Sequence, residues 1–354
     1  MLWNMIEMQY NFPLLPGLAE VWATRFQQVV SERLDMNSLR PSFRQDVREL
    51  VKVGAGWLRV PMERTWLTEG THHAALIAML SAGLAGKAIA VDGLSYSGAL
   101  DQMRMLGCEI VGCAMDTAGM MPESLLEACE LRGVKAIYLM PTVQNPLGAT
   151  MPAARRQELL AVAREFDLVV LEDDAYGFMD ASAPTRLVEM APERVFLLTA
   201  LSKSFVPAAR SGWLVAPERW GARVESAVKA TATGVSLPHA RAAASLIADG
   251  TVDRVIAEKN AEGAIRNAAA RAVLGEWCAE GVGTAWHLWV DVPTGTSEAF
   301  EAKMRELEVL VSGGNWFATR EDAPQGVRVA LGGEVERERM MVGVERIAEA
   351  LRLR

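Results

Sequence analysis

A lysine in the middle of the chain is placed for nucleophilic chemistry. Lys203 follows an apolar, strand-like stretch at residues 195–198, within the run Thr-Ala-Leu-Ser-Lys-Ser-Phe at 199–205. A lysine carried to the end of a buried strand loses its hydration, which costs several kcal/mol unless its pKa falls. A lysine with a lowered pKa is a nucleophile that can form a Schiff base with an aldehyde. The alternative interpretation is a solvated loop with two unrelated cations, Lys203 and Arg210.

A second motif could bind an anion. Residues 68–73 read Thr-Glu-Gly-Thr-His-His and precede a helical stretch with apolar positions over 74–80. A turn of small residues that opens a helix presents free backbone N–H groups and the positive end of the helix dipole. Gly70, Thr71 and His72 are therefore candidates for binding a phosphate group. An ordinary helix cap by Thr71 is the simpler alternative.

The elements that position these residues alternate between short strands and helices. Apolar runs lie at about residues 66–67, 88–91, 109–114, 134–140, 168–172 and 195–200. This alternation predicts an α/β fold in which a mostly parallel sheet is covered by helices on both faces. Ligands bind beyond the carboxyl ends of the strands in such sheets. Gly70, Asn145, Asp173, Tyr176 and Lys203 each follow a predicted strand, so we expect them to converge on one rim.

The carboxy-terminal part of the chain has a different pattern. Residues 219–280 are predicted to be mainly helical, residues 286–292, 309–312 and 327–331 to be strands, and residues 334–353 to form a closing helix. Arg328 lies inside the last of these strands, between apolar neighbours. An arginine in such a strand is uncommon, and its planar fork suits the binding of a carboxylate.

Composition excludes several classes of partner. The net charge of −8 and the pI near 5.3 argue against binding to nucleic acid or to an anionic membrane surface. The four cysteines have neither the spacing nor the histidine neighbours of a metal site, so we predict no metal and a reducing compartment. No signal peptide and no apolar stretch of about 20 residues is found. We therefore expect a soluble cytoplasmic protein that acts on small molecules.

Taken in order, the motifs resemble those of the class I and II aminotransferases, a family of fold type I enzymes that use pyridoxal 5′-phosphate (PLP). The resemblance extends from about Asn11 to the end of the chain. It implies a large PLP-binding domain over residues 46–245, with a mostly parallel seven-stranded sheet, and a smaller α+β domain over 246–354. The amino-terminal segment, residues 1–45, would join the small domain. The resemblance also implies a homodimer with active sites near the interface.

The resemblance implies roles for the residues around the cofactor phosphate and the lysine. Lys203 would hold PLP as a Schiff base and later move a proton at the substrate Cα. Arg210 and Ser202 would bind the cofactor beside it. Gly70, Thr71 and His72 would cradle the phosphate at the start of their helix.

The resemblance implies further roles at the cofactor ring and the substrate. Asp173 would keep the pyridine nitrogen protonated, and Tyr176 would hydrogen-bond the phenolic oxygen. Asn145, in an Asn-Pro-x-Gly turn, would also donate to the phenolic oxygen and would contact the substrate. Tyr96 would stack on the ring, although a core aromatic at a helix start is the alternative. Arg328 would grip the substrate carboxylate.

Three positions depart from the family pattern. Ala200 stands where a hydroxyl residue often binds the phosphate, which leaves Thr199 as a substitute. Residues 37–43, Asn-Ser-Leu-Arg-Pro-Ser-Phe, lack the tyrosine that reaches the phosphate of the neighbouring subunit in the family. Glu69 places a carboxylate beside the phosphate turn, and nothing in the sequence explains it.

The resemblance implies the transfer of an amino group between an amino acid and a 2-oxo acid. A lyase, decarboxylase or cyclase with the same residues is the alternative, because the fold does not decide which bond at Cα breaks. A regulator that binds PLP without turnover is a third possibility. Such regulators carry a DNA-binding domain ahead of the fold, and the short segment before Asn11 and the acidic charge disfavour it.

Overall fold

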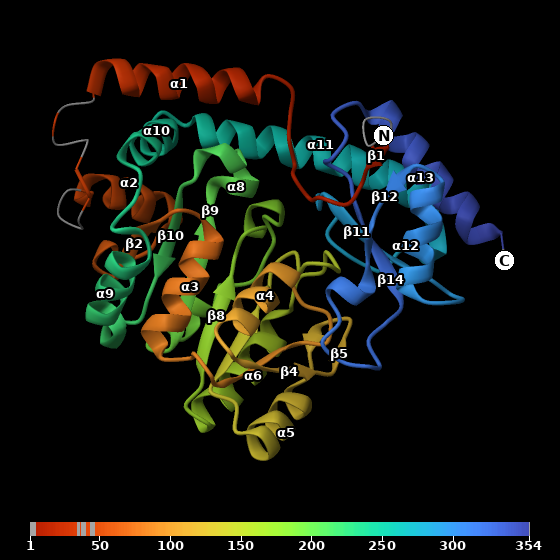
Figure 1. The fold of residues 1–354 in the computed structure, drawn as a ribbon, viewed down its shortest axis with the longest axis horizontal. Helices are drawn as coiled ribbons and strands as arrows, with labels where there is room; N and C mark the ends of the chain where they lie inside the picture. The colour runs from red at the N-terminus through yellow and green to blue at the C-terminus, as the bar shows by residue number, and fades with distance from the viewer. Residues whose placement is uncertain (1–4, 34–35, 37–39, 43–46, 354) are drawn as a thin grey trace.

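The computed structural model describes residues 5–33, 36, 40–42 and 47–353. Its centre is a seven-stranded sheet with the strand order β2-β10-β9-β8-β7-β3-β4 (Figure 1). The strands are β2 (Thr65–Thr68), β3 (Ala88–Asp92), β4 (Glu109–Cys113), β7 (Ala136–Leu139), β8 (Val169–Asp173), β9 (Val195–Ala200) and β10 (Gly212–Val215). A two-stranded ribbon, β5 (Met115–Asp116) and β6 (Gly119–Met120), lies beside them.

The sheet is mostly parallel, which confirms the predicted fold class. Each neighbouring pair from β4 to β9 is parallel, and β10 is antiparallel to both β9 and β2. Strand β10 begins at Gly212, where the chain passes tightly between two others. A Cβ atom at Gly212 would lie 2.7 Å from the carbonyl oxygen of Thr199 and 2.9 Å from Cα of Gly70. Only glycine therefore fits at this position, where β9, the strand before Lys203, meets the turn at Gly70. We call this turn, residues 68–73, the anion turn.

Helices cover both faces of the sheet because alternate residues of each buried strand point to opposite sides. Ala136 and Tyr138 of β7 face one core, and Ile137 and Leu139 face the other. The first core is closed by α3 (Thr71–Ala82), α4 (Ser97–Met105) and α9 (Gly221–Ala232). The second is closed by α5 (Pro122–Arg132), α6 (Ala153–Glu165) and α7 (Leu187–Met190). The large sheet thus has a hydrophobic core on each side.

The predicted helical region at 219–280 consists of three main helices. These are α9, α10 (Leu237–Ala248) and α11 (Thr251–Leu274). Thr233, with φ of 54°, and Gly250, with φ of 77°, are left-handed residues that end one helix or precede the next. Together with α1 (Leu18–Arg33) and α2 (Arg48–Leu58), α10 packs over the short helix α8 (Leu201–Ser204) (Figure 1).

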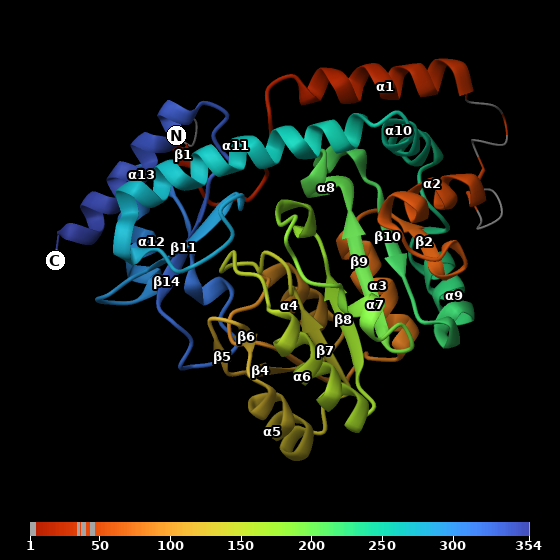
Figure 2. The same ribbon diagram turned by 180° about the vertical axis from the view of Figure 1, so that it is seen from behind.

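A smaller α+β unit follows. Strands β11 (His287–Asp291), β14 (Gly326–Ala330) and β13 (Ser312–Gly313) form an antiparallel sheet, against which α12 (Ser297–Glu306) and α13 (Arg337–Arg352) pack. Strand β1 (Ile6–Glu7) pairs with β12 (Val309–Leu310). Both views show that helix α11 begins near the carboxyl end of β9 and extends across to this smaller unit (Figures 1 and 2). No helix in the described part of the chain is long and apolar enough to cross a membrane.

Candidate active site

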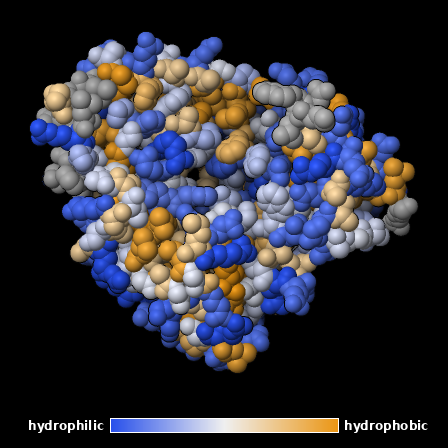
Figure 3. Space-filling model, in the orientation of Figure 1, coloured by the Kyte–Doolittle hydropathy of each residue, from blue (hydrophilic) through white to orange (hydrophobic). Residues whose placement is uncertain are grey.

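A cavity of about 280 Å³ opens at the carboxyl ends of the central strands. The space-filling view is hollowed near its centre, over the ends of β8 and β9 (Figure 3). Ten of the eleven residues predicted for the site line this cavity, namely Gly70, Thr71, His72, Tyr96, Asn145, Asp173, Tyr176, Ser202, Lys203 and Arg210. The eleventh, Arg328, bonds to one of them. The predicted convergence of residues from separate strands on one rim is therefore confirmed.

Lys203 lies in the single turn of α8, directly after β9. Its Nζ donates a hydrogen bond to the carbonyl oxygen of Asn11 over 2.5 Å and lies 4.0 Å from the ring centroid of Phe12. Burial, and after it the positive charge of Arg328, lowers the pKa of this amine to about 7, whereas the negative charge of Asp173 opposes the shift. The structure therefore places a partly neutral amine inside the cavity.

The anion turn faces this lysine from the start of α3. Gly70 has φ of 109°, and α3 begins at Thr71. A Cβ atom at Gly70 would lie 3.7 Å from Oγ of Ser202 and 3.9 Å from the guanidinium of Arg210. Arg210 itself has φ of 42°, which is rare outside glycine, and its Nη2 donates to the carbonyl oxygen of Glu69 over 2.5 Å. Backbone, hydroxyl and guanidinium donors therefore converge on one small space.

The structure shows what the Glu69 carboxylate binds, which the sequence did not indicate. Its Oε1 accepts a hydrogen bond from the backbone N–H of Ser236 over 2.6 Å, at the start of α10. The carboxylate thus binds a backbone N–H at the start of another helix. Thr199 is also engaged elsewhere, because its hydroxyl donates to the carbonyl oxygen of Asp174 over 3.3 Å. Within the segment that lacks the family tyrosine, residues 37–39 and 43 lie outside the described residues.

Asp173 ends β8 and is almost fully buried. The hydroxyl of Tyr138 donates to its Oδ2 over 2.7 Å, and the backbone N–H of Ala175 donates to its Oδ1 over 3.1 Å. Burial raises the pKa of Asp173 to about 6, and the Tyr138 hydrogen bond is the largest effect in the opposite direction. Asp173 therefore remains mainly ionised at neutral pH, as a partner for a buried cation.

Arg328, on β14, contacts the lining of the cavity through Asn145. Its Nη1 donates to Oδ1 of Asn145 over 2.9 Å, and its Nη2 donates to Oγ of Ser312 over 3.2 Å and also to the carbonyl oxygen of Gln9. Its Nε is buried and has no hydrogen-bond partner among the described residues. A buried guanidinium with a free donor is costly unless a ligand completes it. The arrangement therefore suits a carboxylate ligand.

Two aromatic residues border the remaining walls. Tyr176 is buried, with its ring 5.7 Å from Nζ of Lys203, and burial raises the pKa of its hydroxyl. Nε2 of His72 lies 2.7 Å from the hydroxyl of Tyr96. A Cβ atom at Gly98 would lie 2.7 Å from the end of the Tyr96 ring and 2.9 Å from the His72 ring, so glycine makes room for this pair.

Sequence reasoning missed four residues that touch the predicted site. Phe12 and Asn11 contact Lys203 from the amino-terminal segment, Tyr138 bonds Asp173, and Lys259 bonds the backbone of the lysine turn. In the sequence, Asn11 marks only the point where the family resemblance begins. Tyr138 and Lys259 have no local pattern that marks them, because their partners are distant in sequence.

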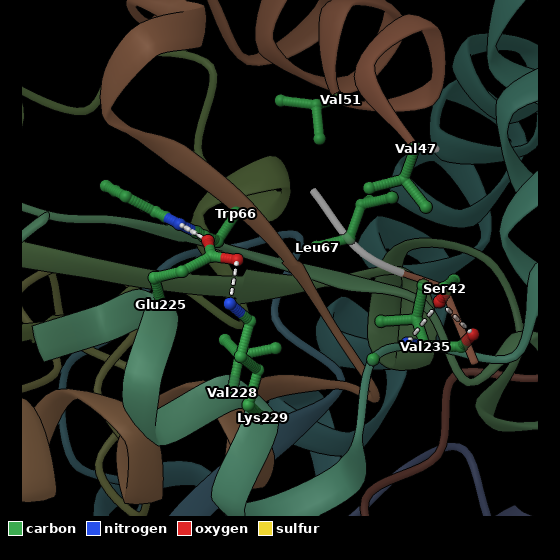
Figure 4. A pocket seen from close by; sticks show the side chains of 10 residues that line it. Ser42, Val47, Val51, Trp66, Leu67, Glu225, Val228, Lys229 and Val235 are labelled. Carbon is green, nitrogen blue, oxygen red and sulfur yellow. Dashed lines mark hydrogen bonds and ion pairs between the residues drawn. The ribbon is translucent and has the colours of Figure 1, made fainter. Parts of the chain in front are cut away.

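A second, smaller cavity of about 30 Å³ lies between β2, α2 and α9 (Figure 4). Aliphatic side chains such as Val51 and Leu67 form much of its lining. Glu225 accepts a hydrogen bond from Nε1 of Trp66 over 3.3 Å and pairs with Lys229 at 3.5 Å. Trp66, Glu225 and Lys229 thus bond one another at this cavity.

Comparison with known sequences identifies the family. The family described as aminotransferase class I and II matches residues 10–347, so the chain belongs to it. The uncharacterized HTH-type transcriptional regulator YjiR of Escherichia coli is 32% identical over 195 residues, which cover 54% of this chain and 41% of that protein. Aromatic-amino-acid aminotransferase 1 of Thermococcus litoralis is 28% identical over 284 residues, which cover 75% and 67%. The chain spans only 41% of YjiR and 60% of YdeF, a similar regulator of Bacillus subtilis.

Solved structures share the fold. The α-aminoadipate aminotransferase LysN of Thermus thermophilus, complexed with N-(5′-phosphopyridoxyl)-L-leucine, matches with a TM-score of 0.88 at 23% identity, covering 99% of this chain and 93% of that one. An archaeal alanine:glyoxylate aminotransferase also reaches 0.88 at 23% identity, covering 98% and 91%. These likenesses confirm the predicted fold type I architecture.

Proposed function

We propose that this chain is a PLP-dependent aminotransferase that moves an amino group between an amino acid and a 2-oxo acid. One observation carries the proposal: an amine of lowered pKa, a buried carboxylate and a helix amino terminus with an arginine converge on one cavity. These are Lys203, Asp173, and the turn at Gly70 with Arg210. The resemblance of sequence and fold to aminotransferases supports the same activity.

The residues present fit PLP as the cofactor. A Cβ atom at Gly70 would begin to fill the space between Gly70, Ser202 and Arg210. This space has hydrogen-bond donors on several sides and suits a phosphate. Asp173, with both oxygens hydrogen-bonded, is positioned to hold a protonated ring nitrogen. Tyr96 provides an aromatic wall on which a pyridine ring would stack.

When bound, PLP supplies an electron-withdrawing ring that stabilises negative charge at the substrate Cα. Lys203, whose amine is easily deprotonated, removes and returns the proton at that carbon. Asp173 keeps positive charge at the ring nitrogen by electrostatic attraction. Tyr176 and Asn145 would donate to the phenolic oxygen, and Arg328 would orient the substrate by its carboxylate. The burial of these groups excludes water and strengthens each interaction.

A second candidate is supported by the relatives named as HTH-type transcriptional regulators. In it the chain binds PLP and an amine without releasing product, as the sensing part of a longer protein. The same cavity would serve both functions, so product formation distinguishes them. A lyase or decarboxylase with the same residues is distinguished in the same way, by its product.

The test is to load the protein with PLP and incubate it with a panel of amino acids. An aminotransferase releases the matching 2-oxo acid and leaves pyridoxamine 5′-phosphate in stoichiometric amount, and a second 2-oxo acid restores the starting spectrum. Release of CO₂ or ammonia without pyridoxamine 5′-phosphate would contradict the proposal in favour of a decarboxylase or lyase. A spectral change without any product would favour the sensor. Lys203→Ala is the matched control.

We also propose a domain organisation and an oligomeric state for the protein. We place a large domain at residues 46–245 and a small domain at 246–354, with residues 1–45 joining the small domain, as the pairing of β1 with β12 supports. A homodimer in the cytoplasm, with active sites near the interface, agrees with the family resemblance.

A further inference from the structure

A second buried lysine lies directly behind the turn that carries Lys203. Lys259, in the middle of α11, is 0% exposed. Its Nζ donates to the carbonyl oxygen of Lys203 over 2.9 Å and to that of Phe205 by a further short hydrogen bond. The two carbonyls flank the carboxyl end of α8, so one ammonium group holds the backbone on both sides of that end.

These carbonyls require a donor. The last carbonyls of a helix have no partner within the helix, and a one-turn helix leaves most of its carbonyls in this position. Phe205 leaves the helical conformation, with φ of −126° and ψ of −95°, and Pro207, which has no N–H, follows. A cation at a helix carboxyl end is favourable because it also meets the negative end of the dipole.

Lys259 is itself fixed from the other side. Its carbonyl oxygen accepts a hydrogen bond from Nε1 of Trp286 over 3.0 Å, just ahead of β11. One helical turn on, a Cβ atom at Gly263 would lie 2.6 Å from the same Nε1. Helix α11 is therefore held close to the small-domain sheet at the point where it holds the Lys203 turn.

The two lysines have different electrostatic surroundings. Lys203 faces Asp173 of β8, Arg328 of β14 and the ring of Tyr176, and His72 lies further along the cavity. For Lys259, the described residues include no carboxylate within 4.0 Å of Nζ, so its charge is met by carbonyl dipoles alone. Burial, and after it repulsion by Lys203, lowers the pKa of Lys259 to about 7. Repulsion between two ammonium groups is mutual, so a charged Lys259 would favour the neutral form of Lys203.

We propose that Lys259 is a positioning residue for the reaction at Lys203: it fixes the backbone of the lysine turn and, by its positive charge, keeps the Lys203 amine neutral. The inference rests on the proposed function only in taking Lys203 as the cofactor-binding lysine. It requires PLP to bind, but it does not require turnover.

The test is a pH titration of the visible absorbance of the PLP-loaded protein. In Lys259→Met the midpoint should rise by about one pH unit, because a like charge has been removed from the neighbourhood of Lys203. Lys259→Arg, which keeps the charge and the donors, should leave the midpoint near that of the wild type. Lys52→Met, a change at an exposed lysine of α2, is the matched control.

Two results would overturn the inference. One is an unchanged midpoint in Lys259→Met with PLP bound, which would reduce Lys259 to a purely structural role. The other is an equal shift in Lys259→Arg and Lys259→Met, which would exclude the charge as the cause. If Lys259→Met does not fold, Lys259→Gln replaces it and is judged by the same two criteria. A shifted midpoint in a protein that releases no 2-oxo acid would leave this inference standing and refute the proposed function alone.

Discussion

Nη1 of Arg328 donates a hydrogen bond to Oδ1 of Asn145 over 2.9 Å, although the two residues are 183 positions apart. The bond joins a strand of the small sheet to a turn at the rim of the large one. It holds the guanidinium beside the cavity, and Nε remains without a partner among the described residues. We propose that a substrate carboxylate completes this arrangement.

Replacing Arg328 by lysine keeps the charge but removes the planar fork. We expect kcat/KM for amino acids to fall roughly ten- to hundredfold, since a charge-assisted contact of about 1.5–3 kcal/mol is lost. The absorbance of the PLP-loaded protein should not change, because Arg328 does not line the cofactor end of the cavity. Arg320→Lys, at an exposed pair with Asp322, is the control. An unchanged kcat/KM would show that the substrate is not held there.

The hydrogen bond from Tyr138 to Asp173 should affect how kcat/KM depends on pH. Burial raises the pKa of Asp173 to about 6, and Tyr138 opposes this shift. Below that pKa, Asp173 is protonated and no longer attracts a positive ring nitrogen, so kcat/KM should fall on the acid side. Tyr138→Phe removes the donor, and we expect the acid limb to move upward by about one pH unit, or ~1.4 kcal/mol. Steady-state kinetics across pH measure it, with the exposed Tyr10→Phe as control. A downward shift of the limb would contradict this assignment.

Two roles for His72 can be distinguished by experiment: a hydrogen bond to Tyr96, or binding of the cofactor phosphate. If its ring acts on Tyr96, His72→Gln should weaken binding of pyridoxal and of PLP alike, by about 2- to 10-fold for one hydrogen bond. Tyr96→Phe should have a similar effect, and the double variant should be no weaker than the worse single one. Equilibrium titration by cofactor absorbance measures this. A loss confined to PLP would instead place the ring of His72 at the phosphate, as predicted from the sequence.

Glu69 should contribute to stability rather than to anion binding. Its carboxylate binds the N–H of Ser236 at the start of α10. Glu69→Ala should therefore lower the free energy of unfolding by about 0.5–2 kcal/mol, the usual effect of losing a helix cap. Urea unfolding measures it, with Glu63→Ala as a comparison at a nearby acidic residue. A large loss of PLP affinity without destabilisation would contradict this role.

The sequence predicts those parts of the site that are encoded locally. Lys203 and Gly70 could be found because each follows a strand and stands in a short motif, and strand alternation predicts the rim on which they meet. Contacts between distant segments could not be found in this way. Lys259 is 56 positions from Lys203, and Glu69 is 167 positions from Ser236. Only the tertiary fold brings these side chains together, and no periodicity in the chain indicates it.

The most direct test of the central claim is to identify the lysine that binds the cofactor. The PLP-loaded protein is reduced with borohydride, digested and mapped by mass spectrometry. We predict a pyridoxyl group on Lys203 and its loss in Lys203→Ala. Lys259 is the informative comparison, because it is also buried and its pKa is also lowered to about 7, yet its Nζ is held by backbone carbonyls. A pyridoxyl group on Lys259 or on any other lysine of the native protein would contradict the account.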